Sequence, residues 1–129
     1  MGKRKLVKLD LDKEFDWIPP EELQEEKPTK FYYKALSNRE FEKFNSQLFK
    51  NEEGKLISEQ GLVDYDMSKA KLVRVENIEI DGSVKIIKQE EIDDSFMDIL
   101  PLEWISDLAS SIRLTSMLKG KEIDELKKP

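Results

Sequence analysis

Residues 78–86 read Ile-Glu-Ile-Asp-Gly-Ser-Val-Lys-Ile, with two short apolar alternations on either side of Asp81-Gly82. Side chains along a strand alternate between the two faces of a sheet, and glycine accepts the positive φ that a tight turn requires. The stretch therefore predicts a β-hairpin and, with it, an antiparallel sheet.

Two stretches nearer the N-terminus have the same strand-like alternation. Residues 5–11 place every second residue from Val7 to Leu11 on one face. Residues 31–36 (Phe-Tyr-Tyr-Lys-Ala-Leu) predict a second strand. Phe31 and Tyr33 face the core, whereas Tyr32 and Lys34 face solvent. Residues 64–76 suit a short helix capped by Asp66 or Ser68, or a strand; we favour a helix that runs into a strand.

Two helices have recognisable starts. Ser37 followed by Glu40 fits a capping box, and Phe41, Phe44, Leu48 and Phe49 then recur at helical spacing until residues 51–54. Pro101 suits the first turn of a longer helix, because its missing amide is not needed there. The apolar stripe of this helix is Leu102, Ile105, Leu108, Ala109 and Ile112. Gly120 is expected to end it, with residues 120–129 a frayed tail.

Residues 12–30 differ in composition from the rest of the chain. They carry Pro19, Pro20, Pro28 and an acidic run, and proline disfavours helix in the residue before it. We expect an extended acidic loop or arm, anchored by Phe15 and Trp17.

The predicted fold is α+β: a small antiparallel sheet of three or four strands packed with about three helices. A chain of 129 residues and 15.1 kDa forms one domain, 1–129. Its apolar runs are far shorter than the roughly 20 residues that span a bilayer. The net charge of -6 argues against nucleic acid as a partner. In Lys30–Lys34, where three aromatic residues stand between two lysines, a half-buried strand explains the pattern better than a base-stacking surface.

The residues that could carry catalysis are scarce. The chain has no cysteine and no histidine, which removes thiol nucleophiles, imidazole bases and Cys/His zinc sites. Asp64-x-Asp66-x-Ser68 opens like a calcium loop, but Lys69 stands where glycine is required, so we expect helix capping instead. Ser68 and Lys71 have the spacing of a serine–lysine pair without its companion motifs. We expect no enzyme, metal or cofactor.

The acidic clusters of the chain could in principle supply paired carboxylates for metal binding or acid/base work. Such runs more often form solvated faces and loops. The clusters are Glu21, Glu22, Glu25 and Glu26 near the N-terminus, and Glu90, Glu91, Asp93 and Asp94 further on.

An apolar stripe near the C-terminus is the candidate for partner binding. Most aromatic and aliphatic residues are expected in the core, but this stripe could extend past it as a ridge for a helix, since Trp and Met favour interfaces. Its members are Phe96, Met97, Leu100, Trp104 and Leu108.

The order of these blocks resembles the tail assembly chaperones of tailed bacteriophages. The resemblance rests on the extended segment from Phe15, the Leu36-Ser37-x-Arg39-Glu40 helix start and the Leu100-Pro101-Leu102-Glu103-Trp104 motif. It implies a non-enzymatic phage protein of the host cytoplasm that binds the helical tape measure protein and keeps it soluble during tail assembly.

Two other readings remain open. One is a virion accessory protein of the head, neck or tail, with 12–30 as an arm across neighbouring subunits and the virion as its location. The other is an inhibitory module whose acidic surface mimics nucleic acid, which predicts steeply salt-dependent binding. A homo-oligomer is compatible with any of the three, because homodimer and partner faces have similar compositions.

Overall fold

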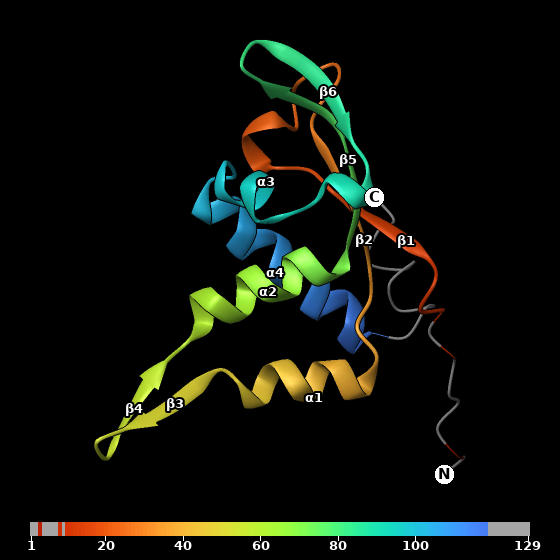
Figure 1. The fold of residues 1–129 in the computed structure, drawn as a ribbon. Coiled ribbons are helices and arrows are strands. Elements are labelled where there is room, and N and C mark those ends of the chain that lie inside the picture. Colours follow the sequence, from red (N-terminus) through yellow and green to blue (C-terminus); the bar gives the residue numbers. More distant parts are fainter. Residues whose placement is uncertain (1–2, 4–7, 9, 119–129) are drawn as a thin grey trace.

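A computed structural model describes residue 3, residue 8 and residues 10–118 of the chain. In this part the fold is α+β, as expected, with a four-stranded antiparallel sheet, a separate two-stranded sheet and four α-helices (Figure 1). The strands are β1 (Glu14–Trp17), β2 (Lys30–Lys34), β3 (Phe49–Glu52), β4 (Lys55–Ser58), β5 (Leu72–Ile80) and β6 (Ser83–Ile87). The helices are α1 (Asn38–Ser46), α2 (Gln60–Lys71), α3 (Asp94–Asp98) and α4 (Leu102–Met117), and 3-10 turns occupy Pro20–Glu22 and Gln89–Glu91.

The main sheet has the strand order β1-β2-β5-β6. The β5–β6 hairpin turns at Asp81 (φ 53°) and Gly82 (φ 82°), which confirms the hairpin predicted from the sequence. A bulge between Val75 and Ile78 holds Asn77 at φ 59° and bends β5.

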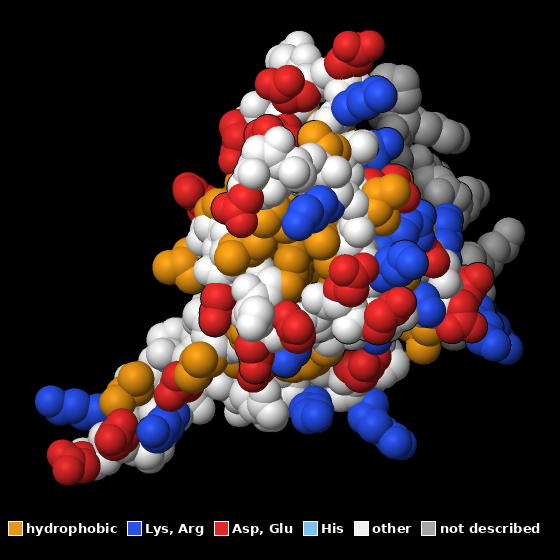
Figure 2. Space-filling model, turned by 45° about the horizontal axis from the view of Figure 1, so that its top comes forward, with side chains coloured by type: hydrophobic (Ala, Val, Ile, Leu, Met, Phe, Trp, Pro, Cys, Tyr) orange, Lys and Arg blue, Asp and Glu red, His pale blue; other side chains and the backbone are white. Residues whose placement is uncertain are grey.

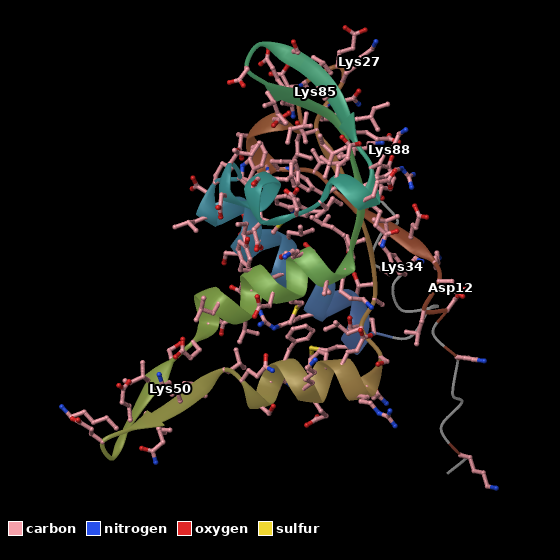
Figure 3. All side chains as sticks on the ribbon, viewed as in Figure 1. Asp12, Lys27, Lys34, Lys50, Lys85 and Lys88 are labelled. Atoms are coloured by element: carbon pink, nitrogen blue, oxygen red, sulfur yellow. The ribbon has the colours of Figure 1, made fainter. Side chains whose placement is uncertain are left out.

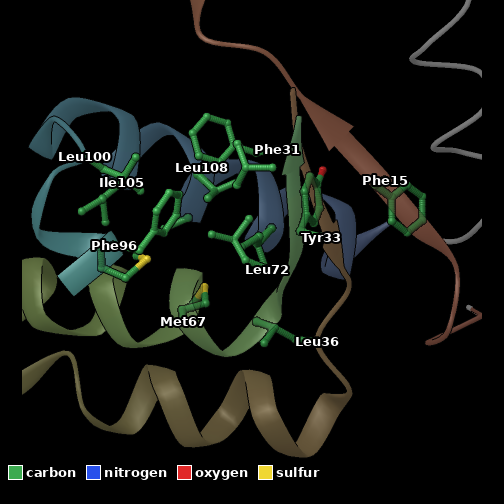
Figure 4. Close-up of a cluster of buried hydrophobic side chains, with 14 of the residues drawn as sticks. Phe15, Phe31, Tyr33, Leu36, Met67, Leu72, Phe96, Leu100, Ile105 and Leu108 are labelled. Atoms are coloured by element: carbon green, nitrogen blue, oxygen red, sulfur yellow. The ribbon is translucent and has the colours of Figure 1, made fainter. Parts of the chain in front are cut away.

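Helices α2, α3 and α4 cover one face of the sheet, and their side chains meet those of β2 and β5 in one core (Figures 1 and 4). Phe31 and Tyr33 are buried on this face, as predicted, and Leu108 and Ile112 of α4 pack in the same cluster. The Tyr33 hydroxyl shares a hydrogen bond of 2.8 Å with the hydroxyl of Thr115, so the polar end of the ring is satisfied inside the core.

Helix α1 begins with the predicted capping box. The Glu40 amide donates to Ser37 Oγ at 3.2 Å, and the Ser37 amide donates to Glu40 Oε1 at 3.0 Å. Lys71, the last residue of α2, donates to both carboxylate oxygens of Glu40 at 3.1 Å. The carboxylate therefore fixes the start of α1 and ties it to the end of α2.

Three expectations need correction. Residues 14–17, expected in the loop or arm of 12–30, form strand β1, because Phe15 is buried beside Tyr33 with ring centroids 5.9 Å apart. Helix α2 runs into β5 as favoured, but it begins at Gln60, so Asp66 and Ser68 lie inside it and cap nothing. Helix α1 ends at Ser46, before Leu48 and Phe49, which were expected on its apolar side. Phe49 instead begins β3, and Glu53 and Gly54 form the turn of the β3–β4 hairpin.

Several predicted features fall partly or wholly outside the described residues. The strand expected over 5–11 includes residues 5–7 and 9, which the structure does not describe. Gly120 and the tail 120–129 are likewise outside, while α4 ends at Met117.

Candidate protein-binding surface

The predicted partner-binding stripe lies where α3 turns into α4. Asp93 caps α3 by accepting from the Phe96 amide at 2.9 Å, and Pro101 stands at the N-cap of α4, one residue before the position expected. The short α3 and the fixed backbone of Pro101 turn the chain so that the apolar side chains of both helices face the sheet.

Four of the five stripe residues are core. The exposed fractions of Phe96, Met97, Leu100 and Leu108 are 6%, 0%, 6% and 1%. Figure 4 shows Phe96, Leu100 and Leu108 pointing into the cluster formed with Phe31 and Leu72. In the folded molecule these side chains stabilise the fold, and they offer almost no surface to a partner.

Trp104 is the stripe residue that reaches the surface. Its ring packs edge-on against Phe31, with centroids 5.8 Å apart and planes at 83°. Its indole Nε1 donates to the carboxylate of Glu21, from the proline-rich segment. Trp104 therefore links α4 to the segment that precedes β2, with one edge in the core and the other at the surface.

The exposed apolar residues at this corner are different ones. Ile99 is 54% exposed and Leu102 is 84% exposed, on either side of Leu100 and Pro101. The sequence placed Leu102 on the buried stripe of α4, but the first residue of that helix extends beyond the elements that cover the rest of the stripe. We call Ile99 and Leu102 the apolar ridge.

A groove lies on one side of this ridge, between the segment 22–29, the β5–β6 hairpin and the α3–α4 turn. Its volume is about 590 Å³. Carboxylates of Glu22, Glu25 and Glu79 line it with a single lysine, Lys27. Its apolar lining comes from Ile78, Ile80, Val84, Ile99, Leu100, Pro101 and Trp104. We call it the Trp104 groove; its chemistry suits an apolar side chain flanked by positive charge.

A second groove, of about 580 Å³, lies on the other side of the ridge, where α2 and α4 begin. Leu62, which is 64% exposed, and Leu102 contribute much of its apolar lining, together with Tyr65 and Ile105. We call it the Leu102 groove. In the view of Figure 2, hydrophobic side chains gather across the middle of the molecule, with acidic and basic side chains interspersed around them.

The motifs considered for catalysis are occupied by structural contacts. Asp64 accepts from Gln60 Nε2 at 2.7 Å and from Arg113 Nη1 at 2.8 Å. Ser68 is fully buried and its hydroxyl donates to the Ile105 carbonyl, whereas Lys71 pairs with Glu40, so the two do not form a serine–lysine pair. Among the described residues, no three acidic side chains converge on a metal site.

The outer face of the sheet does not offer a free aromatic surface. The guanidinium of Arg74 lies 3.9 Å from the centroid of the Tyr32 ring, and Arg74 also pairs with Glu14 and Glu76. Burial, together with the hydrogen bond to Glu76, raises the pKa of Tyr32. The prediction that Lys30–Lys34 forms a half-buried strand is confirmed.

Within residues 10–118, no helix of the structure is long and apolar enough to cross a membrane. Comparison of the chain with protein-family models, with curated proteins and with solved structures finds no match.

Proposed function

We propose that the protein acts by binding a helical segment of another protein, in the manner of a phage tail assembly chaperone that holds the tape measure protein. One observation carries this proposal: the apolar ridge of Ile99 and Leu102 stands exposed between two grooves. Exposed apolar side chains that adjoin apolar grooves are typical of surfaces that receive an amphipathic helix.

The two grooves make different demands on that helix. The Leu102 groove is mainly apolar and would receive leucine or similar side chains at helical spacing. The Trp104 groove has three carboxylates and one lysine, so it favours lysine or arginine on the adjoining face of the helix. A partner with both features gains apolar burial from one groove and charge complementarity from the other.

The experiment is co-expression with the tape measure protein encoded in the same genome, comparing wild type with Leu102→Gln. Glutamine has good helix propensity, so the variant is expected to fold as wild type does. Leu114→Gln is the matched control, because Leu114 is 53% exposed on the same helix and lines neither groove.

We expect wild type and Leu114→Gln to keep the partner soluble, and Leu102→Gln to lose at least tenfold in affinity. Raising the salt concentration should weaken binding only modestly, because most contacts are apolar. Equal binding by Leu102→Gln would contradict the proposed surface. Binding that collapses at high salt would favour the acidic inhibitory module instead.

A stable component of the virion is the second candidate. The β3–β4 hairpin favours it, because all its residues are exposed and its strand edges are open to a neighbouring subunit (Figure 1). The expected result for that function is that purified particles contain the chain at a fixed copy number.

A further inference from the structure

The β3–β4 hairpin, Phe49–Ser58, projects from the molecule between α1 and α2 (Figures 1 and 3). All eight strand residues are exposed, and the exposed fractions of Phe49 and Leu56 are 61% and 76%. An isolated two-stranded hairpin is marginally stable in water, and three or more strands are usually needed. The hairpin therefore lacks the additional strand or covering surface that would make it stable.

The register shows which backbone groups of β3 are free. Lys50 lies opposite Ile57 and Glu52 opposite Lys55, and the Glu59 amide donates to the Leu48 carbonyl at 2.7 Å. Leu48 and Glu59 are thus a hydrogen-bonded pair, and in an antiparallel ladder every second pair is hydrogen-bonded. Counting in steps of two from Leu48, Lys50 and Glu52 direct their backbone groups toward β4. Phe49 and Asn51 therefore direct theirs outward, at the open edge of β3.

Along this edge a positive side chain, Lys50, and a negative one, Glu52, flank the uncharged Asn51. We propose that a second copy of the chain pairs with this edge in antiparallel register, with a two-fold axis between the two Asn51 residues. Asn51 of each copy then exchanges both backbone hydrogen bonds with its mate. Lys50 of each copy lies opposite Glu52 of the other, in the non-hydrogen-bonded position where side chains are closest.

Charge complementarity selects the second copy as the occupant of this edge. The pairing joins two hairpins into one four-stranded sheet and brings two opposite-charge pairs together, with no like charges opposed at those positions. The corresponding pairing along β4, centred on Leu56, would place Lys55 opposite Ile57 and gain no charge pair. The β3 edge is therefore the better self-complementary surface.

Cysteine cross-linking tests the register. The chain has no cysteine, so Asn51→Cys introduces one thiol per copy at the two-fold axis. The Cα atoms of a hydrogen-bonded antiparallel pair are about 5.5 Å apart, within the range of about 4.4–6.8 Å that a disulfide spans. We expect mild oxidation to convert Asn51→Cys to a covalent dimer. The first control is Lys50→Cys, because residue 50 of one copy lies opposite residue 52, not residue 50, of the other. The second control is Leu56→Cys, which lies on β4. Both should remain monomeric in denaturing conditions.

Charge reversal tests the pairing without any cross-link. Lys50→Glu places two carboxylates opposite each other across the axis, and Glu52→Lys places two ammonium groups there. We expect wild type to show a concentration-dependent dimer in sedimentation velocity, and each reversal variant to remain monomeric. An equimolar mixture of the two variants should regain the dimer, because only the mixed pair restores both opposite-charge contacts.

Within one hairpin, Lys50 Nζ lies 3.8 Å from Glu52 Oε2. Each variant lacks this ion pair both alone and in the mixture, so the pair cannot account for the rescue. The near-UV circular dichroism of the core aromatic residues should be unchanged, because Lys50 and Glu52 are exposed and lie outside the core. A wild type that is monomeric at every concentration, or a Leu56→Cys chain that cross-links in place of Asn51→Cys, would overturn the proposal. Either result leaves the Leu102 groove experiment unaffected, because that surface lies on other residues.

Discussion

At the scale of single residues, the contacts of Glu40 do two separable tasks. Its carboxylate completes the capping box of α1 and pairs with Lys71 at the end of α2. Burial alone would raise the pKa of the Glu40 carboxyl, but the hydrogen bond from the Ser37 amide and the Lys71 ammonium hold it below its ordinary value of 4.5. The lowered pKa means that the folded state favours the charged carboxylate.

Glu40→Gln separates the two tasks, because glutamine also serves in a capping box but carries no charge. The stability that wild type gains from this group is present above pH 4.5 and is lost as the pH falls through the lower pKa of the folded state. We expect the variant to lose about 0.5 kcal/mol at neutral pH and to show a flatter decline of stability in acid. Urea unfolding at several pH values measures both; an identical acid profile would contradict the role of the ion pair.

Tyr65 offers a second residue-scale prediction. Its hydroxyl donates to Asp94 Oδ1 at 2.7 Å, and this hydrogen bond to the carboxylate raises the pKa of Tyr65 to about 12. The stabilisation is therefore present below the ordinary pKa of 10.0 and is lost as the pH rises through 12. In a pH titration followed by tyrosinate absorbance, Asp94→Asn should lower the pKa of one phase toward 10.0. Tyr65→Phe should abolish that phase, which assigns it to Tyr65. No movement in Asp94→Asn would contradict the assignment.

At the scale of elements, sequence reasoning succeeded where a local signal coincides with a buried face. The α1 capping box, the Asp81-Gly82 turn and the alternation of Phe31 and Tyr33 each combine a local preference with burial. It failed at the β3–β4 hairpin, although Glu53 and Gly54 (φ 53° and 79°) have nearly the same backbone angles as Asp81 and Gly82 (φ 53° and 82°). A hairpin with no buried face has no apolar alternation to reveal it.

The exposure of side chains at the candidate surface was predicted less well than the fold. Phe96 in α3 and Leu102 at the start of α4 are both large apolar residues, and only the packing of the other elements decides that the first is buried and the second exposed. The start of α2 was missed for a simpler reason: Glu59, at its N-cap, makes no side-chain capping hydrogen bond. Local patterns therefore did not separate the buried side chains of this region from the exposed ones, and partner binding at this region stays a prediction.

The bulge in β5 carries an element-scale prediction at Asn77. This residue has φ 59°, its side-chain amide donates to the Pro28 carbonyl at 3.3 Å, and its carbonyl accepts from Thr29 Oγ1 at 3.3 Å. Asn77→Gly keeps the conformation and should cost about 1 kcal/mol through the lost hydrogen bond. Asn77→Val should cost more, about 2–3 kcal/mol, since β-branched residues are strained at positive φ. Equal costs in thermal unfolding would contradict the importance of the bulge geometry.

At the scale of the whole molecule, the β3–β4 hairpin is nearly independent of the rest of the described protein, which we call the body. The body has one continuous core, whereas the hairpin contributes no buried side chain to it. Replacing residues 49–58 by Asn-Gly should close the chain with a tight turn, because Leu48 and Glu59 already form a hydrogen-bonded pair. We expect the free energy of unfolding, measured on monomers at low concentration, to change by less than about 1 kcal/mol. A larger loss would show that the hairpin supports the core.

The complementary prediction contrasts two leucines of α4 that the sequence placed on one stripe. Leu108 is 1% exposed and Leu102 is 84% exposed, so a truncation to alanine at each should have opposite consequences. Leu108→Ala leaves a cavity in the core and should cost about 2–5 kcal/mol of stability, while the Leu102 groove keeps its lining. Leu102→Ala should cost less than about 0.5 kcal/mol and should weaken partner binding. Urea unfolding and a binding assay on the same samples, at a temperature where Leu108→Ala stays folded, distinguish the two roles. A Leu108→Ala variant that folds fully yet fails to bind would contradict this assignment. It would mean that Leu108 contacts the partner and that the core opens when the partner binds.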